Sequence, residues 1–333
     1  MEKLNLAILP FVLALIISLI TTPLTIFVFR KLGLVIDPAK IPHPAHIHKR
    51  PVPKGGGIPI FLAVLATALI FLKVDKHLTG ILMAMGLTLV VGLIDDIKGM
   101  SPKARLFFNF AAAGMVVAAG IGIAYVTNPF GAGVIDLSQP RLSFYLFGRL
   151  HEIWLWPDLF ALLWIPILMN AINWSSGVDG QASGMIAIAA FVIGLLSFSY
   201  SADITQWPAA ILAFGLSGAL VGLTIFHFYP QKIMPGYSAT TLAGLLLAVL
   251  AILSTTKVGT ALMVLAIPLV DAGYVVSRRI LSGRSPLAGD RGHLHHKLLE
   301  MGWGRRRIAL FYWGVTAFFG FLALNLNAKM KIF

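Results

Sequence analysis

The most restrictive feature of the sequence is a long apolar run near its start, LAILPFVLALIISLITTPLTIFVF at positions 6–29. A helix needs about 20 predominantly apolar residues to cross the hydrocarbon core of a bilayer. The run is too long for the apolar core of a secretory signal peptide, and no small-residue cleavage site follows it. It therefore predicts a transmembrane helix that is retained.

Composition extends this prediction to the whole chain. Of the 333 residues, 58% are hydrophobic and only 12% are charged, which is more apolar side chain than a soluble domain of this length can bury. We expect one membrane-embedded domain over residues 1–333, an all-α bundle of about ten transmembrane helices. The predicted spans are 6–29, 57–73, 79–95, 105–127, 158–173, 182–200, 207–228, 239–256, 259–277 and 307–325. The chain has no cysteine, which excludes disulfides and thiolate metal sites.

Basic residues gather in alternate loops between these spans. Most of the 26 Lys and Arg residues, and most of the nine histidines, fall in one set of loops. The positive-inside rule places that set in the cytoplasm and both chain termini outside. Basic loops facing anionic lipid explain the net charge of +13, so we do not expect a nucleic-acid partner. The loop at 128–157, on the other side, is predicted to be an interfacial hairpin or amphipathic segment. The loops rich in Lys, Arg and His, which we place in the cytoplasm, are 30–56, 96–104, 174–181, 229–238 and 278–306.

The first polar cluster is HIHKRPVPKGGGIP, at 46–59. Its three glycines precede a predicted helix, and free N–H groups at a helix N-terminus favour an anion. Lys49, Arg50 and Lys54 add positive charge. A flexible basic loop bound to lipid head groups is the alternative.

The second cluster is GLIDDIKG, at 92–99, which places Asp95 and Asp96 at the cytoplasmic end of a span. Carboxylates close to hydrocarbon are costly and usually mark function. Adjacent aspartates are also the hard oxygen ligands that Mg²⁺ favours. A solvated helix C-cap is the alternative, although acidic residues at a helix C-terminus oppose the helix dipole.

The third cluster is MNAINWSSGVDGQ, at 169–181. Asn170 and Asn173 are three residues apart and share a helical face. Asp179 follows in a glycine-rich turn. Amide side chains and exposed backbone suit recognition of a polar ring or a hydrated metal, whereas the alternative is an ordinary helix cap and turn.

The fourth cluster, at 285–307, contains GDRGHLHHKLL. Its His-Leu-His-His run lacks a spaced fourth ligand for zinc, so contact with phosphate oxygens is the better interpretation. Asp271, inside the preceding span, is either a functional intramembrane acid or a partner of Arg278 or Arg279. Together the clusters suggest diphosphate chemistry with Mg²⁺ at the cytoplasmic membrane surface. A transporter of an anionic solute would contain similar residues, but the halves of the sequence show no repeat.

Four segments resemble the polyprenyl-phosphate N-acetylhexosamine-1-phosphate transferases, also called glycosyltransferase family 4. They are HKRPVPKGGG, GLIDDIKG, NAINWSSGVDG and PLVDAGYVVSRRILSGRSPLAGDRGHLHHKLL, in the family's order and over most of the chain. The His-Leu-His-His form resembles the undecaprenyl-phosphate N-acetylglucosamine-1-phosphate transferase branch.

The resemblance implies that a lipid phosphate attacks a UDP-N-acetylhexosamine, most simply UDP-GlcNAc, and releases UMP at the bacterial inner membrane, on its cytoplasmic face. It implies Mg²⁺, with Mn²⁺ as a substitute, undecaprenyl or another polyprenyl phosphate as acceptor, and leaves a homodimer open. Asp95 and Asp96 are the implied catalytic pair, and Asp95, Asp96 and Asp179 the implied metal ligands. The implied substrate-binding residues are His48, Lys54, Asn170, Asn173, Asp179, Arg291, His293, His295 and His296.

Two positions depart from the family pattern. Ser176 stands where the family has the first Asp of its Asp-Gly-x-Asp-Gly segment, and Tyr237, in GYSATTLAG at 236–244, stands where the family has a metal-ligating Asp. Tyrosine is neutral near pH 7 and a poor ligand for Mg²⁺. A non-catalytic homologue that binds UDP-sugar or polyprenyl phosphate is therefore an alternative, as is a phospho-N-acetylmuramoyl-pentapeptide transferase.

Overall fold

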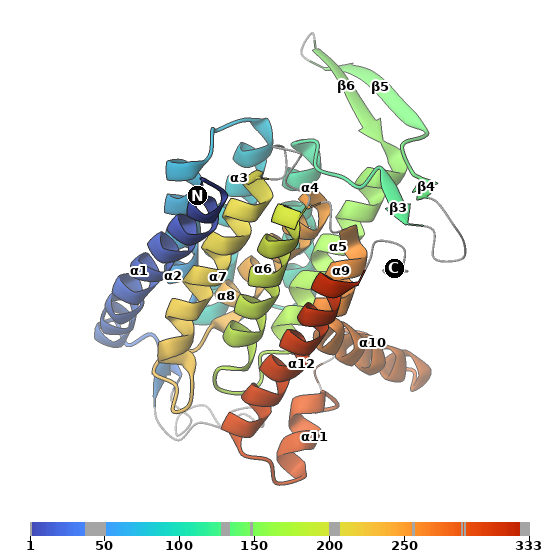
Figure 1. The fold of residues 1–333 in the computed structure, drawn as a ribbon. Coiled ribbons are helices and arrows are strands. Elements are labelled where there is room, and N and C mark those ends of the chain that lie inside the picture. The colour runs from blue at the N-terminus through green and yellow to red at the C-terminus, as the bar shows by residue number, and fades with distance from the viewer. Residues whose placement is uncertain are drawn as a thin grey trace.

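The computed structural model describes residues 2–36, 51–127, 134–146, 149–199, 207–254, 257–287, 289 and 291–326. This part of the chain is mainly helical (Figure 1). The helices are α1 (Glu2–Lys31), α2 (Gly57–Phe71), α3 (Lys76–Lys98), α4 (Pro102–Ala118), α5 (Leu155–Trp174), α6 (Gln181–Ser199), α7 (Trp207–His227), α8 (Gly236–Leu253), α9 (Lys257–Val264), α10 (Ala266–Leu281), α11 (Leu294–Glu300) and α12 (Arg305–Asn325). The strands form three antiparallel pairs: β1 (Val35–Ile36) with β2 (Val52–Pro53), β3 (Tyr125–Thr127) with β4 (Val134–Asp136), and β5 (Arg141–Leu146) with β6 (Arg149–Trp154).

The helical membrane bundle is confirmed, but the count of ten spans is not. Among the described residues, seven helices are long and apolar enough to cross a membrane, or up to eight if a bent pair is one span. The bent pair is α9 and α10, which meet at 85°. Pro268, in the first turn of α10, has no N–H to donate back into α9, so the predicted span 259–277 breaks there.

Two other predicted spans are shorter than expected. α2 has 15 residues and α4 has 17. The span predicted over 105–127 ends at Ala118, and its last three residues form strand β3. Gly120 adopts a φ of +89°, a conformation that ends the helix.

α8 is the central helix of the bundle and contacts α2, α3, α5, α6, α7 and α9. On one side α7 packs between α1 and α6. Small residues allow this close approach: Ser18 of α1 donates its hydroxyl to the Ala219 carbonyl oxygen of α7 at 2.7 Å. Large apolar side chains such as Ile20, Phe27 and Leu69 lie exposed on the outer surface, as expected where lipid is the solvent.

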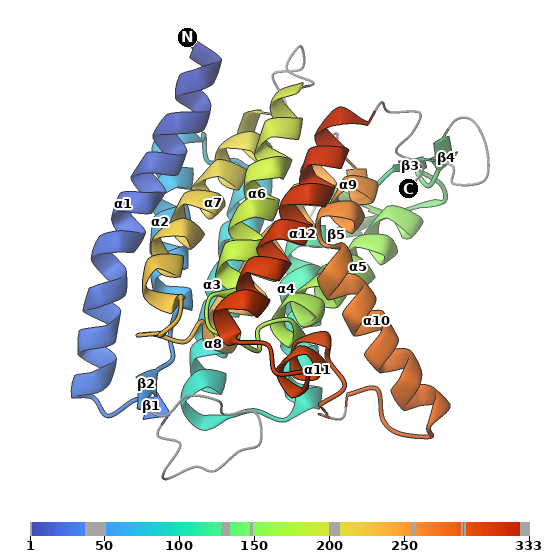
Figure 2. The ribbon, with the colours of Figure 1, turned by 60° about the horizontal axis from the view of Figure 1, so that its bottom comes forward.

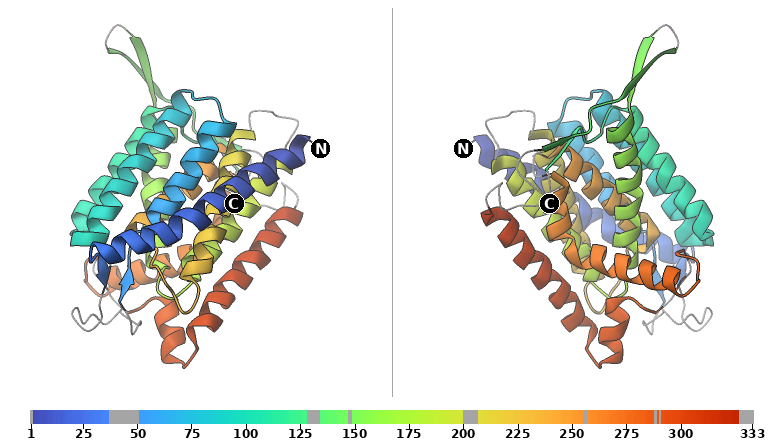
Figure 3. Two further views of the ribbon diagram at one scale, coloured as in Figure 1. Left: turned by 90° about the vertical axis from the view of Figure 1, so that its left-hand side faces the viewer. Right: turned by 90° about the vertical axis from the view of Figure 1, so that its right-hand side faces the viewer.

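The two ends of the bundle differ. The start of α1 and the Asn325 end of α12 lie at one end, together with the β5–β6 hairpin, and α11 and the β1–β2 pair lie at the other (Figures 2 and 3). The antiparallel pairing of β5 with β6 confirms a hairpin within 128–157, whereas its interfacial position stays a prediction. The placement of both termini outside the cell stays a prediction.

Candidate functional site

A polar cavity of about 500 Å³ opens at the end of the bundle where α11 lies. It is built from the last turn of α3, the starts of α4 and α8, the end of α5, and Leu287, Gly289 and the 293–296 segment. Seven of the predicted site residues line it: Lys54, Asp95, Asn170, Asn173, His293, His295 and His296. Among the described residues, the lining does not include Asp96, Asp179 or Arg291. His48 lies outside the described residues.

Asp95 is bound to an arginine that the sequence did not single out. Its Oδ1 accepts hydrogen bonds from Arg105 Nε at 2.6 Å and from Met100 N at 2.9 Å. The Asp95 side chain is only 4% exposed, whereas that of Arg105 is 35% exposed and reaches the cavity. Ser101 caps α4 by accepting from Ala104 N, which turns α4 back along α3 and brings Arg105 to Asp95. This pair therefore fixes one cationic group at the cavity wall.

Asp96 caps the N-terminus of α8 and does not face the cavity. Its Oδ1 accepts from Tyr237 N at 2.7 Å, and its Oδ2 accepts from Ser238 N at 3.2 Å and Ser238 Oγ at 2.6 Å. A carboxylate at a helix N-terminus satisfies free N–H groups and is stabilised by the helix dipole. The geometry thus gives Asp96 a structural role, which the adjacent-aspartate pattern did not predict.

Gly56 and Gly57 also pack against this helix start. A Cβ on Gly56 would lie 2.8 Å from Pro235 Cα, and one on Gly57 would lie 2.7 Å from Ser238 Cβ. The anion site predicted at these glycines is not part of the cavity lining in the described chain. Lys54, just before them, is placed at the cavity by a bridge to Met234.

The last turns of α5 and the turn that follows carry three of the predicted residues. Asn173 Oδ1 accepts from Thr240 Oγ1 of α8 at 2.8 Å, and Asn170 Nδ2 donates to the Pro166 carbonyl oxygen at 2.7 Å. Both asparagines line the cavity, as predicted from their shared helical face. Asp179 is buried beside it, where Oδ2 accepts from Gln231 N at 3.3 Å and Oδ1 lies 3.6 Å from Arg305 Nη1.

The three histidines of the fourth cluster form one wall. His293 and His295 stack with ring centroids 5.8 Å apart, and His296 follows at 4.2 Å from His295. Asp271 positions this wall: its Oδ2 lies 2.8 Å from His293 Nδ1, and its Oδ1 accepts from Leu294 N at 2.8 Å. The intramembrane acid thus orients a histidine of the cavity.

Burial keeps part of this wall uncharged. Burial, with smaller contributions from the neighbouring His296 and His293, lowers the pKa of His295 to about 3, while Asp271 opposes the shift. Burial also lowers the pKa of His296. Both imidazoles are therefore neutral near pH 7, when each ring has one donor and one acceptor nitrogen.

We expect the protein to lose stability as the pH falls below 6.5. The unfolded chain binds a proton at His295 near that pH, whereas the folded state resists it down to about pH 3. At about pH 5.5 this single group costs about 1 kcal/mol of the free energy of unfolding. The measurement is the thermal midpoint in detergent at about pH 7.5 and about pH 5.5. His295→Gln should show a smaller pH-dependent drop, and an equal drop in both proteins would contradict the assignment.

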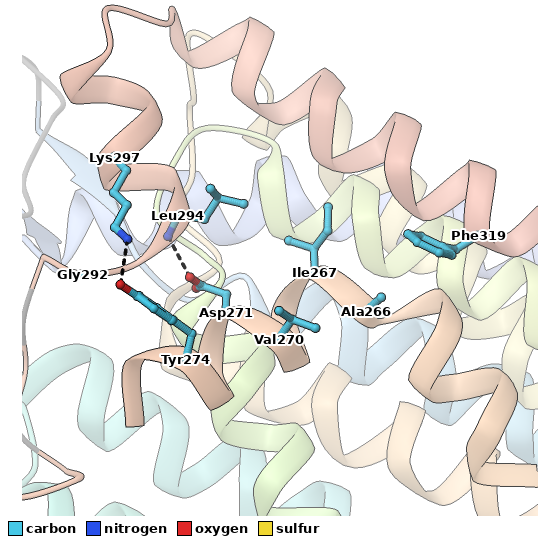
Figure 4. Close-up of a pocket in the computed structure, with 9 residues that line it drawn as sticks. All are labelled: Ala266, Ile267, Val270, Asp271, Tyr274, Gly292, Leu294, Lys297 and Phe319. Carbon is cyan, nitrogen blue, oxygen red and sulfur yellow. Dashed lines mark hydrogen bonds between the residues drawn. The ribbon is translucent and has the colours of Figure 1, made fainter. Parts of the chain in front are cut away.

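A second, apolar pocket of about 520 Å³ lies beside the cavity, against α10 (Figure 4). Ile267, Val270 and Phe319 line it, and Lys297 lies at one end, where its Nζ donates to Tyr274 Oη at 3.4 Å. The 292–297 segment separates the two spaces: Gly292, Leu294 and Lys297 line the apolar pocket, whereas His293, His295 and His296 line the polar cavity.

The carboxylates do not form a site that fits Mg²⁺. Among the residues that the structure describes, no group of three or more His, Cys, Asp or Glu side chains lies close enough to hold a metal ion. Asp95 is bound to Arg105, Asp96 caps α8, and Asp179 lies buried beside Arg305. The expectation of Mg²⁺ or Mn²⁺ bound by these three residues has no support in this geometry.

Sequence reasoning missed several groups that contribute to the cavity. Arg105, Trp174 and Arg279 line it, and Arg279 lies over the Trp174 ring at 5.7 Å. Tyr237, already singled out in the sequence as a departure from the family pattern, also lines the cavity, and its hydroxyl donates to Asn109 Oδ1 at 3.0 Å. The ten-residue spacing between Asp95 and Arg105 across a short helix connection was the one available signal. No signal in the sequence indicated the contact between Tyr237 of α8 and Asn109 of α4.

Fold and cavity define a multi-pass helical membrane protein with a cationic, amide-lined and histidine-lined site at one end of the bundle. The chain belongs to glycosyl transferase family 4, whose model matches residues 78–255, more than half of the sequence. The matched range contains Asp95, Arg105, Asn173 and Tyr237, and it ends before α10 and the histidine wall.

Similarity to curated relatives extends beyond that range. The decaprenyl-phosphate N-acetylglucosaminephosphotransferase of Mycolicibacterium smegmatis is 28% identical over 87% of this chain and 76% of its own length. The probable undecaprenyl-phosphate N-acetylglucosaminyl 1-phosphate transferase of Bacillus subtilis is 25% identical over 98% of this chain and 87% of its own. The undecaprenyl-phosphate alpha-N-acetylglucosaminyl 1-phosphate transferase of Escherichia coli K12 is 29% identical over 86% and 76%.

Proposed function

We propose that this protein transfers N-acetylglucosamine 1-phosphate from UDP-GlcNAc to a polyprenyl phosphate and releases UMP. The observation that carries the proposal is the pairing of a cationic polar cavity with an apolar pocket across the 292–297 segment. A sugar nucleotide matches the first space and a prenyl chain the second. The names of the relatives support the same pair of substrates.

The acceptor phosphate would lie near Lys297, with its prenyl chain along Ile267, Val270 and Phe319. An oxygen of that phosphate attacks the β-phosphorus of UDP-GlcNAc, a P–O bond forms, and the bond to the oxygen that bridges the two phosphorus atoms breaks. The electron pair leaves with UMP. A phosphate monoester has a second pKa near 6, so the nucleophile is largely ionised and needs no strong base.

Positioning and electrostatics then supply most of the rate. Arg105, held by Asp95, provides a fixed cation for the charge that develops on the departing UMP. Neutral imidazoles of His295 and His296 provide hydrogen bonds without adding charge. Asn173, held by Thr240, presents amide hydrogens to the nucleotide.

The distribution of basic loops supports an orientation with this cavity facing the cytoplasm. The bacterial relatives support a location in the bacterial inner membrane, where the reaction would begin cell-envelope glycan synthesis. The whole chain would act as one transferase domain. Homodimer formation stays a prediction from the family resemblance.

Incubating the purified protein with UDP-GlcNAc and undecaprenyl phosphate, in membrane mimetic, tests the proposal. We expect UMP and lipid-linked GlcNAc in equal amounts, measured by chromatography and mass spectrometry. Omitting the lipid phosphate should stop UMP release. Absence of both products with several UDP-sugars, including the pentapeptide-bearing donor, would rule the proposed activity out.

A non-catalytic, substrate-binding homologue is the second candidate, because Ser176 and Tyr237 replace carboxylates of the family pattern and both line the cavity. The double variant Ser176→Asp with Tyr237→Asp separates the two. Activity that arises only in the double variant supports the binding protein, whereas activity in the unaltered chain excludes it.

A further inference from the structure

We propose that this chain binds the diphosphate of its donor substrate without a divalent cation, and that Arg105, stacked on Tyr237, supplies the positive charge. The inference rests on the proposed function, since it assumes a nucleoside diphosphate sugar in the polar cavity. It concerns which groups balance the negative charge of the diphosphate.

Two of the three carboxylates implied as metal ligands, Asp95 and Asp96, already accept hydrogen bonds from the protein, and Asp179 lies buried beside Arg305. Both oxygens of Asp96 accept hydrogen bonds from the start of α8, at 2.6–3.2 Å. A cation bound there would compete with the hydrogen bonds that cap the central helix. Asp95 Oδ1 accepts from two donors, one of them charged. A cation bound to this oxygen would have to displace Arg105 or lie next to its positive charge, and either is costly at a buried carboxylate.

Tyr237 stands where the family pattern has a carboxylate. Its aromatic ring favours the guanidinium of Arg105, whereas a carboxylate would favour a metal ion. The Arg105 guanidinium carbon lies 5.1 Å from the centroid of the Tyr237 ring, which is cation–π distance. The ring hydroxyl donates a hydrogen bond to Asn109 Oδ1. This bond holds the phenol as a neutral donor, which is a poor ligand for a metal ion. Asp95 and Tyr237 thus hold Arg105 from two sides, one by charge and one by its ring.

The charges of the cavity match a metal-free diphosphate. Its described lining contains Lys54, Arg105 and Arg279 as permanent cations and Asp95 as the one carboxylate, which gives 3 − 1 = +2. A UDP-sugar carries about two negative charges at its diphosphate near pH 7. Neutral His295 leaves this balance unchanged. A bound divalent cation would raise the positive charge beyond that of the ligand.

Calorimetry of UDP-GlcNAc binding to the full chain in nanodiscs tests the inference, once with EDTA and once with excess Mg²⁺. We expect the two Kd values to agree within about threefold, and Arg105→Gln to weaken binding by about tenfold or more in both buffers. Arg30→Gln is the matched control, because it removes an exposed cation at the end of α1 that does not line the cavity. Loss of binding in EDTA, by about tenfold or more, would overturn the inference.

Direct metal binding gives a second readout. Electron paramagnetic resonance of added Mn²⁺ should show no stoichiometric site in the unaltered chain or in Tyr237→Phe, and a new site in Tyr237→Asp. A stoichiometric site in the unaltered chain contradicts the proposal. The outcomes also separate the inference from the proposed function: UDP-GlcNAc binding in EDTA without any product refutes the activity alone, and product formation that requires Mg²⁺ refutes the inference alone. No UDP-GlcNAc binding in either buffer refutes the inference.

Discussion

Replacing Arg105 by glutamine is expected to lower kcat for GlcNAc 1-phosphate transfer by roughly a thousandfold. A fixed cation aimed at charge that appears in the transition state contributes on this scale, as single oxyanion donors and arginines in phosphoryl transfer do. Arg105 has such a position, because Asp95 binds its Nε at 2.6 Å and Tyr237 supports its guanidinium. The measurement is the initial rate of UMP release at saturating concentrations of both substrates.

Two further variants make this expectation specific. Arg105→Lys keeps the charge but loses the planar fork that pairs with phosphate and carboxylate, so it should recover only part of the rate. Arg30→Gln should leave the rate unchanged. The glutamine amide can still donate to Asp95, so the thermal midpoint should fall less than it would with alanine at this position. A folded Arg105→Gln protein that keeps more than about a tenth of the rate would show that the cation does not act on the transition state.

Gly236→Ala is expected to cause the largest loss of stability, roughly 3 kcal/mol or more of the free energy of unfolding. Gly236 begins α8 with a φ of +70°, which an L-residue adopts only with strain. An added Cβ would also collide with the carboxylate of Asp96, the group that caps this helix. The variant therefore combines backbone strain, overpacking and the loss of charged hydrogen bonds.

Gly283→Ala separates these causes. Gly283 has nearly the same φ, +66°, but a Cβ there would meet nothing within 4 Å. Only the strain remains, so we expect about 1 kcal/mol. Thermal midpoints of the two variants in one detergent, with UDP-GlcNAc binding as a second readout, provide the comparison. Equal losses would mean that contact with Asp96 contributes nothing.

The sequence predicted the helical bundle because lipid requires long apolar runs and leaves them visible in the sequence. The prediction of one straight span over 259–277 was wrong. The apolar run continues from α9 into α10, but the two helices bend by 85° near Pro268. The prediction also failed at α4, which stops at Ala118 although apolar residues follow. Hydropathy reports burial in lipid and does not report where a helix turns away from the membrane.

The sequence predicted the part of the site that lies on a single helix, but not the contacts that other helices supply. Residues on one face of one helix, such as Asn170 and Asn173, can be grouped by spacing alone. The partners of Asp95 and Asp96 come from α4 and α8, so they could not be inferred from the local pattern. The two adjacent aspartates predicted one shared chemical role, whereas the fold gives one of them an arginine and the other the end of a helix.

The six residues from Gly292 to Lys297 have a practical consequence for ligand design. This one short segment borders both spaces, with Gly292, Leu294 and Lys297 on the apolar pocket and the three histidines on the polar cavity. A compound that joins a uridine-like head to an alkyl chain by a short tether could fill both spaces at once. Binding of the second part would then be intramolecular, with an effective concentration that reaches about the millimolar range when the tether length fits. Weak fragments for each space thus become starting points for a tight bisubstrate inhibitor.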